Sequence, residues 1–139
     1  MLQAMNTGHD GSLTTMHANT TRDTISRMSS MVLLSGIELP LRAIYEMAAS
    51  AIHIIVQINR YSDGTRKITA ISELTGKMVD NLPEIKDVFT FVHKGVNAEG
   101  QVLGEYAATG YIPKCYDDLI SRGLRLSKTI FETHPGRSA

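Results

Sequence analysis

Apolar residues recur with helical spacing in two stretches of the first half of the chain, from Ile25 to Leu34 and from Leu41 to Ala51. This spacing predicts two amphipathic helices, each with one buried face. A threonine before the first stretch, Thr20 or Thr21, is expected to cap that helix, and Gly36 is expected to end it.

The pattern changes after the second helix. His53–Ile58 is β-branched and almost continuously apolar, which predicts a central strand buried on both faces. Ser62–Thr65 is typical of a hairpin turn, and Lys67–Leu74 alternates like a half-exposed strand. Two further strands are expected near Val88–His93 and Gln101–Tyr106, so the chain ends its sheet as an antiparallel meander.

Shorter elements complete the predicted fold. Leu2–Met5 resembles the end of a helix, Ser12–Met16 a short strand, and Tyr116–Arg122 a last helix. Asn81, Leu82 and Pro83 mark a further turn. The sequence therefore predicts a three-layer α/β domain over residues 1–133 whose sheet ends in an antiparallel edge, followed by a disordered tail, 134–139.

Composition narrows the class of protein. Fourteen basic residues balance fourteen acidic ones, so no overall field favours nucleic acid or an anionic membrane. The single cysteine, Cys115, excludes a disulfide framework and a cysteine-based zinc site. The longest apolar run, Ile44–Ile58, is too short and too polar to span a bilayer. We expect a soluble protein of a reducing compartment, with no signal peptide.

The candidate chemistry lies near the amino end. Thr7–Asn19 holds two histidines, His9 and His17, among threonines and asparagines, a set of donors that suits an anionic ligand. This segment resembles the His box of the secretion-superfamily ATPases, the hexameric motors of type II and type IV secretion and of pilus assembly. With Leu2–Asn6 before it, the segment is most similar to the CpaF-like branch, which serves tight-adherence pili.

The resemblance continues beyond the box. Leu39–Ile44 (LPLRAI), Arg66–Glu73 and Thr109–Pro113 (TG-x-x-P) are each similar to segments of that branch. The resemblance implies a RecA-like motor domain that hydrolyses ATP with Mg²⁺ in a hexameric ring. It also implies a cytoplasmic location, at the inner membrane through secretion or pilus platform proteins as partners.

The resemblance also assigns roles to residues. His9 and His17 would lie beside the nucleotide and couple the state of its γ-phosphate to domain movement. Two arginines of the following helix, Arg22 and Arg27, would contact neighbouring elements or subunits. The wall of the nucleotide pocket would be shaped by Asn6, Thr14, Thr15 and Asn19.

One part of such a motor is absent from the sequence. Binding of the ATP phosphates needs a glycine-rich loop with a lysine and a Ser/Thr for Mg²⁺. The only Gly–Lys pair, Gly76–Lys77, is followed by Met78 and has no upstream glycine at the required spacing. The acidic strand that organises Mg²⁺ would precede residue 1. We therefore expect the C-terminal half of a motor domain, which alone neither binds ATP tightly nor hydrolyses it.

Other interpretations stay open. The chain would be an interaction module if it kept only the motor's oligomer-forming or membrane-partner surface. The chain could instead be a small phosphohydrolase that uses His9, Asp10 and His17. In a purely structural interpretation, His17 is a strand-end histidine that bonds to a backbone carbonyl. A metal site is not expected, because the other three histidines lack ligand spacing. Without the P-loop strand and its helix, the parallel sheet would have an unpaired edge and an apolar face near Leu13 and Val56, so we expect self-association or a domain-swapped dimer.

Overall fold

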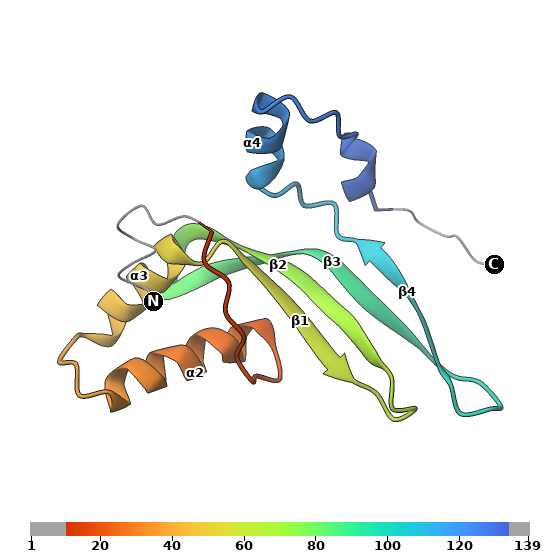
Figure 1. The fold of residues 1–139 in the computed structure, drawn as a ribbon, viewed down its shortest axis with the longest axis horizontal. Coiled ribbons are helices and arrows are strands. Elements are labelled where there is room, and N and C mark those ends of the chain that lie inside the picture. The colour runs from red at the N-terminus through yellow and green to blue at the C-terminus, as the bar shows by residue number, and fades with distance from the viewer. Residues whose placement is uncertain (1–10, 134–139) are drawn as a thin grey trace. The chain divides into compact units, whose positions relative to one another are not determined.

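The computed structural model describes residues 11–133 (Figure 1). The helices are α2 (Thr21–Leu34), α3 (Leu41–Ala51), α4 (Cys115–Ser121) and the 3₁₀ helix η1 (Lys128–Phe131). The strands are β1 (Ile54–Arg60), β2 (Arg66–Val79), β3 (Leu82–Val96) and β4 (Val102–Ala108). The helix predicted at Leu2–Met5 and the tail predicted at 134–139 lie outside this range. No helix within 11–133 has the length and apolarity needed to cross a membrane.

The prediction of α2 is confirmed, including its cap. The Thr20 hydroxyl oxygen accepts a hydrogen bond from the backbone N–H of Asp23 at 3.0 Å, which satisfies one of the amides that a helix start leaves unpaired. At the other end Gly36 adopts φ +78°, a left-handed conformation that glycine reaches without a steric penalty. The helix therefore begins and ends on local signals.

The first core lies between α2 and α3, which pack against each other. Ile25 and Met28 of α2 meet Ala48 and Ala51 of α3, and Leu74 of β2 closes the cluster. The three- and four-residue spacings place these side chains on one face of each helix. The helical predictions are confirmed because burial follows this spacing.

The sheet is an antiparallel meander in the order β1-β2-β3-β4, as expected for the end of the domain. The predicted hairpin at Ser62–Thr65 is confirmed, since Tyr61 N–H donates to the Thr65 carbonyl at 2.9 Å. The second turn is centred on Asp80 and Asn81, whose φ values of 51° and 62° are those of a type I′ hairpin. Leu82, which the sequence assigned to the turn, already begins β3.

The prediction that His53–Ile58 forms a central strand buried on both faces is wrong. β1 lies at the edge of the sheet, and one row of its side chains, Ile54, Val56 and Ile58, is 40%, 50% and 54% exposed. The β-branched composition reports only that a segment fits a pleated surface. Which strands flank it depends on contacts distant in the sequence.

The predicted strand at Ser12–Met16 is also wrong. Residues 11–18 have no regular secondary structure, and Leu13 within them is 96% exposed. A strand requires a neighbour to receive its backbone hydrogen bonds. None of the four strands in the described sheet provides that neighbour to this segment.

The second core collects aromatic residues from the C-terminal part of the chain. Val88 of β3, Tyr116 of α4 and Phe131 of η1 are buried together, with Phe89 and Tyr111 packed against them. The predicted last helix is confirmed to within one residue at each end, and Gly123 follows it at φ +88°. The sequence did not predict η1, which the Ser127 side chain caps by accepting from the Thr129 N–H.

The chain divides into two compact units. The first contains the described residues up to Ile55 and Leu74–Ile85, and the second contains Val56–Glu73 and the residues from Lys86 onward. Each unit has its own core. The strands β1, β2 and β3 are each divided between the two units. The α/β class and the closing meander are confirmed, and the RecA-like three-layer arrangement stays a prediction.

Candidate functional site

Of the histidine-containing segment Thr7–Asn19, the structure describes residues 11–19, a largely exposed polar stretch that leads into α2. We call it the polar segment. Met16 is partly buried and packs against the first core, which fixes the middle of the segment to the helices. The neighbouring side chains of Thr15 and His17 are exposed, as is Thr14. One apolar anchor therefore holds a row of polar groups at the surface.

The structure brings four of the predicted site residues together and leaves others undescribed. Thr14, Thr15, His17 and Asn19 are exposed within the six residues 14–19, which directly precede the Thr20 cap. They provide two hydroxyls, an imidazole and an amide, all groups that hydrogen-bond an anion. His9, Asn6 and Asp10 lie outside the described residues, so their proposed roles remain predictions.

Arg22 and Arg27 occupy exposed positions on α2. Residues five positions apart are separated by about 140° around a helix. The two guanidinium groups therefore leave α2 in different directions and do not form one anion site. Their proposed role in contacts to other elements or subunits remains a prediction.

The Gly76–Lys77 pair does not form an alternative phosphate-binding site. The pair lies inside β2, and the backbone N–H of Lys77 donates to the Thr75 hydroxyl at 3.3 Å. A phosphate loop needs several consecutive free amides before a helix. Within residues 11–133 no three His, Cys, Asp or Glu side chains gather as a metal site would require.

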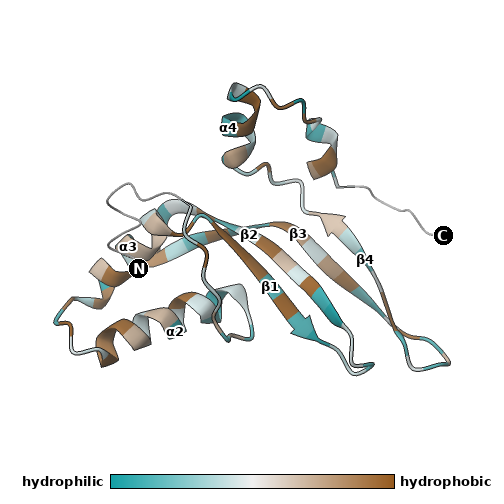
Figure 2. Ribbon diagram, in the orientation of Figure 1, coloured by the Kyte–Doolittle hydropathy of each residue, from teal (hydrophilic) through white to brown (hydrophobic). Residues whose placement is uncertain are grey.

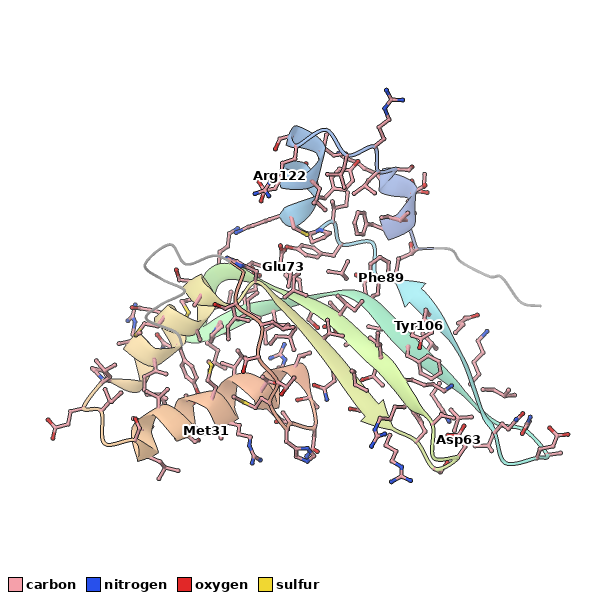
Figure 3. All side chains as sticks on the ribbon, viewed as in Figure 1. Met31, Asp63, Glu73, Phe89, Tyr106 and Arg122 are labelled. Carbon is pink, nitrogen blue, oxygen red and sulfur yellow. The ribbon has the colours of Figure 1, made fainter. Side chains whose placement is uncertain are left out.

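The sequence did not reveal a buried carboxylate, Glu73, which is 4% exposed in the second unit (Figure 3). Its oxygens accept hydrogen bonds from the Tyr111 hydroxyl at 2.5 Å and from the backbone N–H of Lys114 at 2.8 Å. Charge-assisted bonds of this kind are stronger than neutral ones. Glu73 therefore fixes the segment between β4 and α4 to β2.

The TG-x-x-P motif, Thr109–Pro113, is the sequence motif that contains or adjoins the partners of Glu73, Tyr111 and Lys114. The Thr109 hydroxyl donates to the backbone carbonyl of Asp87, and Thr109 N–H donates to that of Val88 at 3.0 Å. Pro113 is buried. The motif thus fixes the course of the chain after β4, and its residues have a structural role.

Cys115 is not an activated nucleophile. Burial raises the pKa of its thiol, and the nearby Glu73 carboxylate raises it further. A reactive cysteine needs the opposite, a positive environment that favours the thiolate. The chemistry of this side chain therefore does not extend the candidate site.

Asp63 is a second residue that the sequence did not single out beyond its turn. One carboxylate oxygen accepts from the Thr65 hydroxyl at 2.7 Å and from the Thr65 N–H at 2.9 Å, and the other accepts from the Val102 N–H at 2.8 Å. These bonds, that from the Thr65 hydroxyl first, lower the pKa of Asp63 to about 2. The carboxylate links the β1–β2 turn to the start of β4 (Figure 3).

This linkage predicts a pH dependence of stability. The pKa of Asp63 is lowered on folding from 3.8 to about 2, so its contribution is complete above pH 3.8 and disappears as the pH falls towards 2. Urea unfolding of the wild type and Asp63→Asn between pH 5 and 2 should show a difference in unfolding free energy that shrinks with acid. Asp80→Asn, in the other turn, is the matched control and should show no such trend. A wild-type advantage that is constant over this range would contradict the assignment.

An aromatic cluster covers part of the second unit. The Phe91 ring lies 5.6 Å from that of Tyr61 and 5.2 Å from that of Tyr106. It also lies over Gly104, where a Cβ atom would come within 2.3 Å of Phe91 Cζ. A pocket of about 220 Å³ is lined by Ile68, Ile71, Phe89, Thr90 and Tyr106. The polar groups of its lining are the hydroxyls of Thr90 and Tyr106, and no carboxylate, amine or imidazole lines it.

Comparison with known proteins identifies the protein family, which the geometry of the site alone does not. The family described as Type II/IV secretion system protein matches residues 1–94, which include the polar segment, both long helices and most of the meander. Two curated relatives carry the provisional name of conjugal transfer protein, one in each of the Mycobacterium tuberculosis strains CDC 1551 / Oshkosh and ATCC 25618 / H37Rv.

The chain is 31% identical to each relative over 74 residues. This alignment covers 53% of the chain and 20% of each relative, so the chain matches about a fifth of their length. The family match extends over more than half of the chain. The chain therefore belongs to the type II/IV secretion system protein family.

Proposed function

We propose that the chain is a segment of an ATP-driven secretion motor and that its polar segment forms one wall of the nucleotide site. Membership of the secretion family supports the first part. The observation that carries the second is the exposure of Thr14, Thr15 and His17 beside a partly buried anchor, Met16. A core segment would bury such groups against partners, whereas a ligand wall presents them to solvent.

In this proposal His17 senses the nucleotide. An imidazole N–H donates to a γ-phosphate oxygen when ATP is bound and loses that partner after hydrolysis. Because Met16 is packed on the first core and Thr20 caps α2, a shift of His17 is passed directly to the helix. The polar segment thereby couples phosphate state to movement of α2 and α3.

The phosphate cradle and the Mg²⁺ ligands come, in this proposal, from motor segments outside this chain. Catalysis of phosphoryl transfer depends on positioning and on charge stabilisation by those groups. We therefore propose that the chain alone is inactive. The parent would be a hexameric motor of the CpaF-like branch, on the cytoplasmic side of the inner membrane with platform proteins as partners.

ATP turnover by a chimera tests this function. Residues 1–94 replace the matching segment of a full-length, ATP-hydrolysing member of the family. We expect the chimera to hydrolyse ATP within about tenfold of its parent and the 139-residue chain alone to show no Mg²⁺-dependent turnover. In the chimera, His17→Ala should lower kcat by about 10²-fold, since loss of one positioned hydrogen-bond donor to a charged transition state costs about that much.

His53→Ala in the same chimera is the matched control, because His53 is also exposed but directly precedes β1 and is not part of the polar segment. Its turnover should equal that of the unmodified chimera. Equal turnover of the His17 variant, or a folded chimera without activity, would contradict the proposal. Mg²⁺-dependent turnover by the chain alone would contradict the claim that it lacks a complete site.

A second candidate function is that of a non-catalytic interaction module derived from the motor. The exposed apolar side chains of α2 favour it, since Met31, Leu33 and Leu34 are 53%, 44% and 86% exposed. Surface of this kind often marks a contact with another protein. Co-purification with a full-length family member, abolished by Leu34→Lys but not by His17→Ala, would favour the module over the motor segment.

A further inference from the structure

The first turn of α2, Thr21–Thr24, is held more weakly than the rest of the helix. It contains two threonines, whose β-branched side chains lower helix propensity. Arg22 and Asp23 are exposed, and the buried side chains of α2 begin at Ile25. Figure 2 shows the same division, with a hydrophilic start to α2 and hydrophobic positions further along the helix. The turn therefore depends on its own hydrogen bonds more than on packing.

Three of those hydrogen bonds end on Thr20. Its hydroxyl oxygen accepts from the Asp23 N–H at 3.0 Å, and its carbonyl oxygen accepts from the Thr24 N–H and hydroxyl, each at 3.1 Å. Thr20 itself has extended backbone angles, φ −138° and ψ 164°, so it belongs to the segment that leads into the helix. A rotation of Thr20 would therefore weaken all three bonds at once.

Thr20 also ends the path from His17 to the helix. The polar segment runs to residue 19, directly before the cap, and Met16 on the other side of His17 packs against the first core. Because Met16 holds that side, a displacement of the His17 backbone passes along the chain to Thr20. The imidazole assigned above to phosphate sensing therefore lies between an apolar anchor and a helix cap.

The cap opens more easily than the packed part of α2 moves. Loss of a threonine cap changes helix stability by about fivefold, whereas burial of one isoleucine or methionine side chain is worth about tenfold to a hundredfold. Ile25 and Met28, 4% and 5% exposed, hold the rest of the helix in the first core. Couplings between ligands and protein conformations are about 5–150-fold. A coupling of that size opens the first turn but does not release both buried side chains.

We infer that the first turn of α2 is the element that responds to the nucleotide. It unwinds when the γ-phosphate draws His17 towards it, and it rewinds to the described conformation when that phosphate leaves. Thr20 is the positioning residue of this switch. Arg22 lies within the turn and changes direction with it, whereas Arg27 lies on the packed part of α2 and does not. The inference rests on the proposed function and identifies its first moving part.

Amide hydrogen exchange on the whole chain tests the cap in the absence of nucleotide. Thr20→Ala should accelerate exchange at Asp23 and Thr24 about fivefold and leave the amide of Met28 unchanged. Thr20→Ser keeps the hydroxyl and should restore the wild-type rates. Ser127→Ala, which removes the cap of η1, is the matched control and should leave the first turn of α2 unchanged. Equal rates at Asp23 and Thr24 in the wild type and in Thr20→Ala would overturn the inference.

Exchange in the chimera that carries residues 1–94 tests the link to the nucleotide. Asp23 and Thr24 should exchange about fivefold or more faster with a non-hydrolysable ATP analogue than with ADP, while Met28 exchanges equally with both. His17→Ala should remove that difference, and a difference that persists would overturn the inference. So would a first turn that exchanges equally with both nucleotides in a chimera whose kcat depends on His17, a result that leaves the proposed function intact. Equal kcat with and without His17 would instead contradict the proposed function, and the inference with it.

Discussion

Replacing Ile44 by alanine is expected to lower the free energy of unfolding by about 3–5 kcal/mol, within the range measured for fully buried aliphatic side chains. Ile44 is 0% exposed and is the largest fully buried apolar side chain among the described residues. The loss combines the transfer free energy of three carbon atoms with the cavity that they leave. Urea unfolding followed by circular dichroism gives the free-energy difference.

Leu41→Ala is the matched control for this change. Leu41 lies one turn earlier on α3 and is 44% exposed, so its truncation should cost less than about 1 kcal/mol. Equal losses for the two variants would show that α3 is not packed by the face that contains Ile44, Ala48 and Ala51. The first core described above would then be incorrect.

Replacing Glu73 by alanine is expected to cost about 2–4 kcal/mol. The side chain is 4% exposed and accepts from both the Tyr111 hydroxyl and the Lys114 N–H. Its removal breaks both of these hydrogen bonds, and a hydrogen bond to a charged group contributes about 1.5–3 kcal/mol. Lys114 is exposed, so water offsets part of that loss. The same unfolding measurement gives the value, and local amide exchange should increase at Lys114.

Glu73→Gln separates the hydrogen bonds from the volume of the side chain. Glutamine keeps the shape and one acceptor oxygen, so we expect it to lose about half as much as alanine does. Tyr111→Phe, which removes one donor alone, should also be intermediate. An alanine variant as stable as the wild type would mean that Glu73 does not clamp the segment between β4 and α4.

The local parts of the fold could be predicted from the sequence. The Thr20 cap, Gly36 and the turn at Ser62–Thr65 each act through bonds between residues at most four positions apart. The helical spacing of Ile25, Met28 and Ile44 was equally informative. Such signals need no knowledge of distant partners, so they survive in the folded chain.

The errors concern contacts between distant residues. The composition of β1 fits an edge strand as well as a central one, and only the strand order distinguishes them. Ser12–Met16 has the residues of a strand but no partner within the described sheet. Both segments have the residue composition of a strand. Whether each forms a strand, and at which place in the sheet, depends on its neighbours in the folded chain.

In the candidate site, too, local groupings could be predicted and contacts between distant residues could not. The sequence placed Thr14, Thr15, His17 and Asn19 together because they are neighbours in one motif. It could not reveal that Glu73 meets Tyr111 across 38 residues or that Asp63 meets Val102 across 39. Those pairs depend on the register of the meander and on the path of the chain after β4, which no short motif encodes.

The central claim is that the polar segment of this secretion-family chain faces a nucleotide whose phosphates are held by other parts of a motor. The most direct measurement is kcat for ATP hydrolysis by the chimera that carries residues 1–94, with His17 and with His17→Ala. The account predicts a loss of about 10²-fold on that single change, with His53→Ala unaffected. Equal kcat values for the chimera and its His17→Ala variant would contradict it.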